Sequence, residues 1–275
     1  MALEVKEFEF IRNLLQKRSA IVLDDEKYYL VESRLQPLAR REGFASVGEL
    51  VFKLQTDRLN GLHQKVVEAM TTHETSFFRD IRPFDALRRA VLPERIAAHS
   101  STRRLRIWCL ACSAGQEPYS VAMLIRDAFP QLQTWDVSIV ATDISMQILE
   151  KAREGVFSQL EINRGLPAPY LLKFFQRHGI NWRVNDDIRK MIDFRSMNLI
   201  EPWPAVPPVD VVLLRNVLIY FDVSTKKEIL AKVRRMLSPD GYLLLGGAES
   251  TLNLDEAFRR VEFEKSSFYR LHTLN

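Results

Sequence analysis

The chain has 275 residues, of which 47% are apolar and 27% are charged, as expected for a globular protein with one large domain or two smaller ones. Its net charge of +4 is modest, whereas nucleic-acid-binding proteins usually concentrate positive charge, so the composition does not indicate a nucleic-acid partner. No apolar run approaches the roughly 18 residues of a membrane span, and the first residues do not resemble a signal peptide. These features predict a cytoplasmic protein that does not insert into a membrane.

Residues 1–72 are predicted to form a small all-helical domain. Apolar residues recur there at intervals of three and four, as in Phe8, Ile11, Leu14 and Leu15, which is the periodicity of an amphipathic helix. Pro37 is expected to start or kink a helix rather than to continue one. The region contains 11 Lys and Arg and 11 Asp and Glu, so any basic surface on it has to come from the local arrangement of its side chains.

After about residue 92, short β-rich runs alternate with helical periods. Strands are predicted at residues 105–110, 137–141, 191–195, 209–214 and 242–245, and helices over 118–129, from 145 onward and over 225–237. The last helix is expected to end at Ser238-Pro239-Asp240-Gly241. Residues 258–263 and 267–271 indicate an antiparallel pair at the end of the chain. This order predicts an α/β fold with a doubly wound, mostly parallel sheet.

Between about residues 165 and 196 the alternation is interrupted. A helical stretch over Tyr170–Phe175 and the polar segment Gly179–Arg189 indicate a small inserted subdomain, which we interpret as a β-hairpin on the main sheet. The loop around residues 178–184 is short and has no glycine-rich extension.

Polar residues directly follow three predicted strands, at the edge where ligands bind in open parallel sheets. After the first strand, Gly115 allows a close approach of the backbone to a ligand, but the segment is not the G-x-G-x-x-G of dinucleotide-binding proteins, which argues against an NAD enzyme. Asp143 follows the second strand and either accepts hydrogen bonds from both hydroxyls of a ribose or caps the next helix. Arg215 and Asn216 follow the apolar run 209–214, where they either line a cleft or cap a loop.

Five motifs, taken in order along the chain, carry a more specific signal. They are Thr75-Ser76-Phe77-Phe78-Arg79, Ser113-Ala114-Gly115-Gln116-Glu117-Pro118-Tyr119-Ser120, Asp143, Asn198-Leu199 and Arg215-Asn216-Val217-Leu218-Ile219-Tyr220-Phe221. Together they resemble the chemotaxis protein-glutamate O-methyltransferase family (CheR type), and the resemblance covers nearly the whole chain. Ala114 and Gln116 depart from it, since Thr and Glu are commoner there.

The resemblance implies a division of the chain. It comprises an all-α domain over residues 1–72, a linker over residues 73–90 that contributes to the cofactor site, and a class I, Rossmann-like methyltransferase domain over residues 91–275 that contains the inserted subdomain. It also implies a bound S-adenosylmethionine and no metal. The residues expected to line the cofactor site are His73, Thr75, Arg79, Glu117, Asp143, Asn198, Leu199, Arg215 and Asn216.

Within this site the resemblance suggests individual roles. Arg79 is expected to pair with the methionine carboxylate of the cofactor, Glu117 with its amino group and Asp143 with its ribose. Arg215, Tyr220 and Arg79 are expected at the reacting centre, where they orient the acceptor and do not transfer protons. Arg79 has an alternative role as a surface ion-pair partner. The aromatic pair beside it, Phe77 and Phe78, is more typical of a core.

The implied reaction transfers a methyl group to glutamate side chains of methyl-accepting chemotaxis receptors, giving methyl esters and S-adenosylhomocysteine. The expected partner is the helical cytoplasmic domain of such a receptor, and the protein is expected to be a monomer that does not bind nucleic acid. Lys27, Arg34 and Arg41 are spaced by seven residues, so on one helix they form a stripe that either meets an acidic receptor helix or is a solvated face. Because the loop at residues 178–184 is short, docking of a receptor's C-terminal peptide is not expected.

Three other functions compete with this interpretation. A methyltransferase-like domain without turnover would act as a sensor or scaffold. Cys109-Leu110-Ala111-Cys112 matches a C-x-x-C redox motif, although the first cysteine lies within a predicted strand and the second at its tip, where the two side chains point differently. A nucleic-acid methyltransferase is the nearest enzymatic alternative, and the neutral N-terminal region argues against it.

Overall fold

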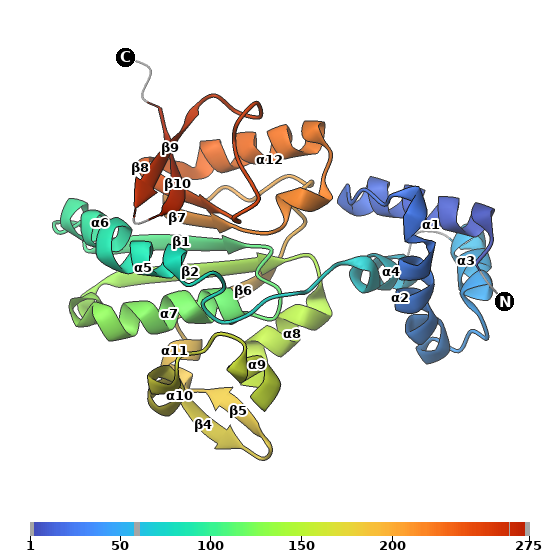
Figure 1. Ribbon diagram of the computed structural model, residues 1–275, viewed down its shortest axis with the longest axis horizontal. Coiled ribbons are helices and arrows are strands. Elements are labelled where there is room, and N and C mark those ends of the chain that lie inside the picture. Colours follow the sequence, from blue (N-terminus) through green and yellow to red (C-terminus); the bar gives the residue numbers. More distant parts are fainter. Residues whose placement is uncertain (1–2, 58–60, 264, 273–275) are drawn as a thin grey trace. The chain divides into compact units, whose positions relative to one another are not determined.

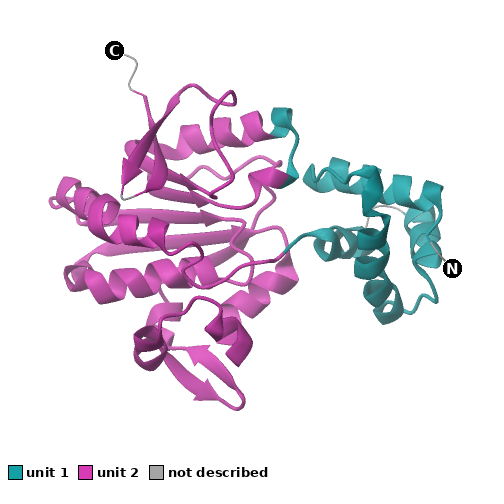
Figure 2. Cartoon of the chain, in the orientation of Figure 1, with its two compact units in different colours: residues 1–72, 220–225 teal, residues 73–219, 226–275 magenta. Residues whose placement is uncertain are grey.

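The structure of the protein is a computed structural model that describes residues 3–57, 61–263 and 265–272. The chain divides into two compact units, drawn in different colours in Figure 2. The first comprises residues 1–72 together with 220–225, and the second comprises residues 73–219 together with 226–275. The first unit therefore contains, besides the expected helical region, a short segment from far along the chain, and the expected domain bounds stay a prediction.

The first unit is built from helices. They are α1 (Val5–Ser19), the 3-10 turn η1 (Asp25–Lys27), α2 (Tyr28–Arg41), α3 (Val47–Thr56) and α4 (Gly61–Met70). Their apolar stripes meet in a core that fully buries Phe8, Ile11, Leu15, Leu35, Leu50 and Val66. Ser46 caps α3, because its hydroxyl accepts a hydrogen bond of 3.1 Å from the amide of Glu49. The prediction of an all-helical region is confirmed.

Pro37 lies inside α2, so it does not start a helix, and the kink expected at this residue stays a prediction. An interior proline costs about 3 kcal/mol, because it removes one hydrogen bond and crowds the preceding turn. The neighbouring Leu35, Leu38 and Ala39 are buried, and their packing offsets that cost. The chain leaves the helix at Gly43, which has a φ of 87° that glycine adopts without strain.

Among the described residues of the second unit, seven strands form the main sheet in the order β6-β2-β1-β7-β8-β10-β9. Their bounds are β1 (Arg104–Leu110), β2 (Asp136–Asp143), β6 (Ile192–Ser196), β7 (Val209–Leu214), β8 (Leu237–Leu245), β9 (Phe258–Phe263) and β10 (Ser266–Leu271). The first five strands in this order are parallel, and β10 and β9 are antiparallel. The strand order reverses between β1 and β7, which places a ligand crevice at their carboxyl ends.

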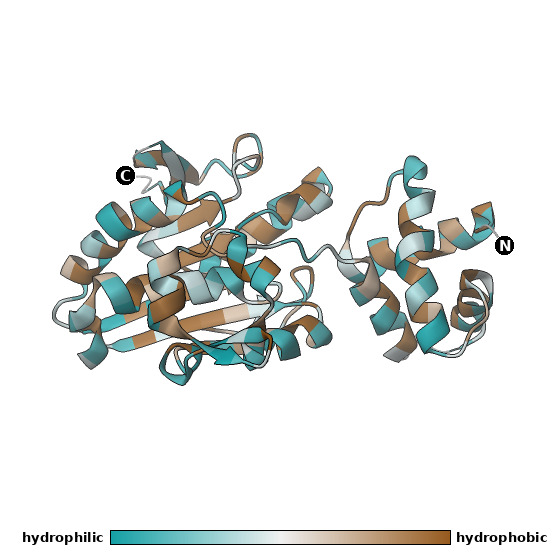
Figure 3. Ribbon diagram, turned by 60° about the horizontal axis from the view of Figure 1, so that its bottom comes forward, coloured by the Kyte–Doolittle hydropathy of each residue, from teal (hydrophilic) through white to brown (hydrophobic). Residues whose placement is uncertain are grey.

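Helices cover both faces of this sheet (Figure 1). They are α5 (Arg82–Ala86), a π-helical turn η2 (Leu87–Val91), α6 (Leu92–Ala98), α7 (Gln116–Ala128), η3 (Pro130–Thr134), α8 (Met146–Glu154), η4 (Leu218–Tyr220) and α12 (Val223–Met236). Leu105, Ile107 and Cys109 of β1 share one core with α5, α6 and α7. Trp108 points the other way, towards Trp203 and, beyond it, Lys232 of α12. The strands are accordingly brown along much of their length in Figure 3, as expected for strands buried on both faces.

The end of α12 differs in detail from the prediction. The helix ends at Met236, but Ser238-Pro239-Asp240-Gly241 does not form a turn outside the sheet. These residues belong to β8, which begins at Leu237 and shifts register against β7 between Val209 and Val211. A bulge admits proline and glycine into a strand, because the ladder is interrupted there.

A second, three-stranded sheet has the order β3-β5-β4. It is formed by β3 (Val156–Phe157), β4 (Phe175–His178) and β5 (Asn181–Val184), with α9 (Gln159–Asn163), α10 (Ala168–Phe174) and α11 (Asp186–Arg189). The predicted hairpin is confirmed, with Gly179 at φ 61° opening its two-residue turn, but it belongs to this second sheet and not to the main one. The predicted bounds of 165–196 are wrong, because the small sheet already begins at Val156 and β6 belongs to the main sheet. Within the described ranges, no helix has the length and apolar character needed to cross a membrane.

Candidate functional site

The turn after β1 brings backbone amides to the carboxyl edge of the main sheet. Ala111 and Ser113 have positive φ values of 54° and 52°, and Gly115, with φ 91°, is the N-cap of α7. A Cβ on Gly115 would lie 3.1 Å from the Cβ of Ala152 and 3.3 Å from Cζ of Phe194. The missing side chain therefore leaves room for α8 and β6 to pack closely, and the approach of a ligand to the backbone of this turn stays a prediction.

Asp143 ends β2 and is 5% exposed. Its Oδ2 accepts a hydrogen bond of 2.9 Å from the amide of Ser113, and its Oδ1 accepts one of 3.0 Å from the amide of Ser145. Ser145 itself caps α8, so the alternative role of Asp143 as the helix cap is wrong. Burial raises the pKa of Asp143, although the amide donors act against it. A carboxylate offers about four acceptor positions, so the backbone amides do not exhaust those of Asp143 and a ribose hydroxyl can also donate to it.

A buried ion-pair network joins α7 to the end of β7. The side chain of Arg215 is 2% exposed, and its Nη1 donates to Oε2 of Glu117 at 3.0 Å. Its Nη2 donates to Oδ2 of Asp80 at 2.9 Å and to the carbonyl of Arg79 at 3.0 Å. Burial raises the pKa of Glu117, and the positive charge of Arg215 opposes that effect. Arg215 therefore ties three segments together, which goes beyond the cleft-lining or loop-capping role expected of it.

The segment before α5 is anchored by its aromatic residues. Phe77 and Phe78 are buried, as their composition suggested, and the ring of Phe77 lies 4.9 Å from that of Phe157. The amide of Phe78 donates to the hydroxyl of Ser120 at 2.9 Å. Arg79 comes next, and its Nη1 donates to the carbonyl of Glu74 at 2.9 Å. The charge of Arg79 lowers the pKa of Glu117, as that of Arg215 does, so the two arginines act on the same carboxylate.

His73 and Thr75 precede this anchor and are half-buried. The carbonyl of His73 accepts a hydrogen bond of 3.2 Å from the hydroxyl of Ser113. This contact holds the start of the second unit against the turn after β1. His73 also lies close enough to Asp143 to act electrostatically on it, in the direction that lowers the pKa of this carboxyl group.

The loop after β6 carries Asn198 and Leu199 and is held in place by α12. Lys232 donates hydrogen bonds to the carbonyls of residues 199, 200 and 201 at 2.8, 2.9 and 2.9 Å. The indole nitrogen of Trp203 donates to the carbonyl of Leu199 at 3.0 Å. Burial lowers the pKa of Lys232. One lysine thus donates hydrogen bonds to three backbone carbonyls of this loop.

Asn216 has a positive φ of 58° and is fixed through its backbone. Oε2 of Glu249 accepts hydrogen bonds of 2.7 Å from the amides of Asn216 and Gly246, and its Oε1 accepts one of 2.9 Å from the amide of Val217. A Cβ on Gly246 would lie 2.8 Å from the backbone nitrogen of Asn216, so a side chain is excluded there. The glutamate binds the loops after β7 and β8 to each other.

Asp80, Glu249 and Lys232 were not predicted from the sequence. Glu249 lies in the glycine-containing loop after β8, so the rule applied to the other strand ends would have found it. Asp80 follows no strand, and its only signal is its place directly after a motif residue. Lys232 carries no such signal. It lies on a helix, and its carbonyl partners are about thirty residues away in the sequence.

Tyr220 belongs to the first unit, where its carbonyl accepts a hydrogen bond of 2.9 Å from the amide of Val22. The predicted basic stripe also lies in that unit, but Lys27 is in η1 and not on α2, so a single helix carrying all three residues is wrong. Arg34 is half-buried, and its guanidinium donates to the carbonyls of Met70 and Thr71 and to the hydroxyl of Thr72. Carbonyls at a helix end attract a cation, so Arg34 is held by α4. The role of these residues towards a substrate stays a prediction.

Cys109 and Cys112 are free thiols, and both are buried. Burial raises the pKa of each thiol well above its usual range, and neighbouring carboxylates add to this effect. A redox cysteine needs the opposite, because only the thiolate reacts. No cluster of three or more possible metal ligands is present among the described residues.

The residues at the carboxyl edge fit the cofactor that the resemblance implies. Asp143 and Glu117 are desolvated carboxylates, which suit a ligand with hydroxyl groups and a positive charge. Arg79 supplies a cation for a carboxylate group. S-adenosylmethionine carries all of these groups.

Comparisons with known proteins identify the family of the chain. Residues 73–267 match the CheR methyltransferase, SAM binding domain, and residues 6–71 match the CheR methyltransferase, all-alpha domain. Chemotaxis protein methyltransferase 1 of Pseudomonas aeruginosa is 43% identical over 96% of this chain and 97% of its own length. The chemotaxis protein methyltransferase of Escherichia coli is 34% identical over 94% of this chain and 89% of its own length.

Among solved structures, the glycopeptide N-methyltransferase MtfA complexed with S-adenosylmethionine is 17% identical, with a TM-score of 0.34 over 66% of this chain and 65% of that one. The assignment therefore depends on the sequence relatives and the two matching domains. The chain belongs to the CheR family of chemotaxis protein methyltransferases and is an S-adenosylmethionine-dependent enzyme.

Proposed function

We propose that this methyltransferase esterifies glutamate side chains on the helical cytoplasmic domain of methyl-accepting chemotaxis receptors, giving glutamate methyl esters and S-adenosylhomocysteine. The observation that carries the proposal is the similarity, over almost its full length, to chemotaxis protein methyltransferases. We also propose that it acts as a monomer in the cytoplasm.

The proposed reaction requires the protein to position the reacting groups, and it does not require a proton transfer. A glutamate side chain with a pKa near 4.3 is already an anion at pH 7, so it needs no general base. Held by the residues of the site, S-adenosylmethionine would supply a methyl group on a sulfonium, a leaving group that would keep the electron pair of the carbon–sulfur bond when the carboxylate oxygen takes the methyl carbon. The contribution of the protein is then to hold the reacting atoms in line and exclude water.

The contacts of the site divide this task. Asp143 has acceptor positions for a ribose, Glu117 suits an amino group, and Arg79 suits a carboxylate. Arg215 already donates to two carboxylates and a carbonyl. We therefore propose that Arg215 is a positioning residue that holds Glu117, and that Tyr220 is the better candidate for contact with the acceptor.

Recognition of the receptor is proposed to need no tethering peptide. The hairpin of the small sheet turns within two residues, between His178 and Asn181, so it offers no long loop to enclose a bound peptide. Methylation rates of receptor fragments with and without the C-terminal tail should therefore be alike. Loss of methylation on removal of the tail would contradict this.

Base lability of the product tests the proposed chemistry. The protein is incubated with S-adenosylmethionine labelled in its methyl group and with bacterial membranes that contain receptors, and the labelled receptor is then treated with mild base. A glutamate methyl ester releases the label as methanol, whereas an N-methyl group keeps it. Label that stays on the protein would reject ester formation. A parallel reaction with receptors whose methylated glutamates are changed to alanine controls for other acceptors.

A further inference from the structure

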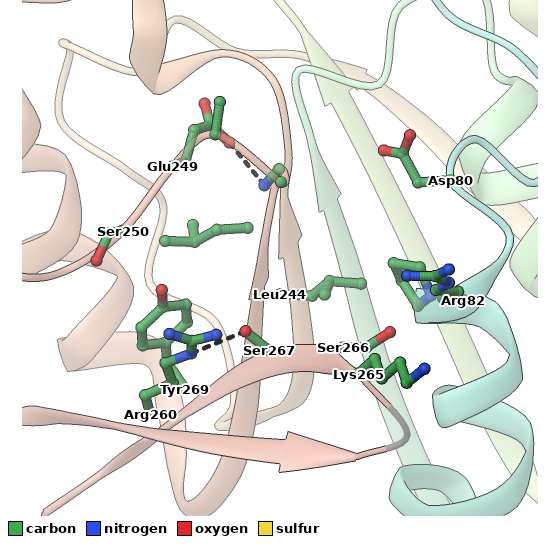
Figure 4. Close-up of a pocket in the computed structure, with 15 residues that line it drawn as sticks. Asp80, Arg82, Leu244, Glu249, Ser250, Arg260, Lys265, Ser266, Ser267 and Tyr269 are labelled. Atoms are coloured by element: carbon green, nitrogen blue, oxygen red, sulfur yellow. Dashed lines mark hydrogen bonds between the residues drawn. The ribbon is translucent and has the colours of Figure 1, made fainter.

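A cavity of about 540 Å³ lies within the second unit, beside the carboxyl end of β8 and the start of β10 (Figure 4). The ends of β8 and β10 form two of its walls, and the segment at the N-terminal end of α5, with Asp80 and Arg82, forms a third. Cavities of this size hold small molecules in other proteins. None of the residues assigned to the cofactor is among its lining residues, but Asp80 contacts Arg215 and Glu249 contacts the amide of Asn216, so the cavity adjoins the expected cofactor site.

Three cationic side chains surround the cavity. Figure 4 shows Arg82 and Lys265 on one side and Arg260 on the other. Arg260 contacts Glu262 at 2.7 Å and the hydroxyl of Ser267 at 2.8 Å. Within the part of the chain that the structure describes, Arg82 and Lys265 make no hydrogen bond or ion pair, so their charges are available to a ligand.

The two carboxylates of the lining do not neutralise these cations. Asp80 is already paired with Arg215. Glu249 accepts three hydrogen bonds from backbone amides of the loops after β7 and β8. Each carboxylate therefore serves the packing of the neighbouring site. Arg260 is paired with Glu262, so the charges of Arg82 and Lys265 are the ones that no described carboxylate compensates.

Ser266 marks the inner surface of the same cavity. The residue is 4% exposed, and among the described residues its hydroxyl has no hydrogen-bond partner. A buried hydroxyl without a partner is costly and uncommon in folded proteins. In Figure 4 this hydroxyl lies on the side of the cavity that carries Arg82 and Lys265. A ligand oxygen at this position would satisfy it.

We propose that this cavity is a binding site for a small phosphate-bearing molecule. Arginine, lysine and hydroxyl donors are the groups that bind phosphate oxygens in proteins. The volume exceeds that of one acidic side chain, which favours a small molecule over a single glutamate of a receptor helix. The site adds a ligand to the enzyme that neither the methyl transfer nor the cofactor requires.

Calorimetric titration of the full chain with inorganic pyrophosphate, at constant ionic strength, tests the proposal. We expect saturable binding at submillimolar concentration. The double variant Arg82→Gln/Lys265→Gln should weaken it by about tenfold or more, because it removes two of the three cations. Ser266→Ala should weaken it by roughly threefold and leave the melting temperature unchanged or higher, because the hydroxyl has no partner in the unliganded protein.

The matched control is Arg104→Gln/Lys227→Gln, which removes the same charge from exposed positions outside the cavity. It should bind pyrophosphate as the unchanged protein does, and all variants should keep their affinity for S-adenosylmethionine. Absence of binding at millimolar pyrophosphate, or an equal loss in the control, would overturn the proposal. A third outcome would also overturn it: the unchanged protein binds no pyrophosphate, and the Arg82→Gln/Lys265→Gln variant has a higher KM for receptor fragments. The cavity would then contact acidic receptor side chains.

Discussion

Asp143 is the residue whose single substitution best separates cofactor binding from folding. Asp143→Asn keeps the size of the side chain and one acceptor oxygen but removes the charge. We expect the affinity for S-adenosylmethionine to fall by about 1.5–3 kcal/mol, the range for hydrogen bonds to a charged group. Calorimetry measures the loss, and Asp193→Asn, on the exposed side of β6, is the control. Unchanged affinity in a folded variant would show that Asp143 serves only the amides of Ser113 and Ser145.

The same buried carboxylates predict a pH dependence of cofactor binding. Burial raises the pKa of both Asp143 and Glu117 above the usual values of carboxyl groups. A raised pKa means that these groups take up protons at a higher pH on acidification, and the neutral forms are poorer acceptors for a positively charged ligand. Affinity for S-adenosylmethionine should therefore decline as the pH falls from neutral, starting above the range in which an exposed glutamate titrates. Calorimetry between pH 5 and 8 would measure this, and a constant affinity would contradict it.

At the scale of elements, the loop after β6 depends on a helix that follows it in the chain. Lys232→Met removes three hydrogen bonds from the carbonyls of residues 199–201 but keeps the aliphatic length of the side chain. We expect cofactor affinity to fall by roughly threefold to tenfold, because Asn198 and Leu199 lose their support, and stability to fall by about 1–3 kcal/mol. Thermal unfolding and calorimetry measure the two effects. Lys227→Met, on the same helix but exposed, should change neither quantity. Equal effects in both variants would show that the hydrogen bonds of Lys232 do not support the loop.

The bulge in β8 contains a sequence that is typical of a turn. The sequence pattern Ser-Pro-Asp-Gly is typical of a turn, and α12 does end just before it. The backbone nevertheless stays in the sheet, because the neighbouring strand supplies partners on both sides of the register shift. Arg95 also forms an ion pair with Asp240 in this segment. A local pattern therefore identified the irregularity but not the strand that surrounds it.

At the scale of the whole molecule, receptor recognition by charge can be tested on the first unit. Lys27→Glu/Arg41→Glu should raise the KM for receptor by roughly threefold to tenfold, and added salt should reduce the difference, because exposed charges are screened beyond about 10 Å at 0.1 M ionic strength. Cofactor affinity should not change. Lys6→Glu/Lys53→Glu, which alters the same charge on α1 and α3, is the matched control. If the Lys27→Glu/Arg41→Glu variant behaves like this control, these basic residues are only exposed to solvent and do not contact the receptor.

Arg34 is left out of that variant because its guanidinium is held by the end of α4. Its reversal would combine any effect on the substrate with a loss of stability of the first unit. The distinction was not visible in the sequence, where the three basic residues have the same spacing. It arises because Arg34 faces the carbonyl end of a neighbouring helix, whereas among the described residues Lys27 pairs with Asp24 and Arg41 with Glu42, both close to them in the sequence.

The sequence by itself determined the fold class, the helical character of the N-terminal region and the positions of the polar residues after the parallel strands, since these follow from periodicity and from motifs that are local in the chain. It also indicated the cofactor and the family. Only the tertiary structure decided which partners these residues have: Arg215 with Asp80 and Glu117, Asp143 with two amides, and Lys232 with a distant loop. Such pairings depend on which chain segments meet at the sheet edge. Local sequence patterns do not encode contacts between segments that lie far apart in the chain.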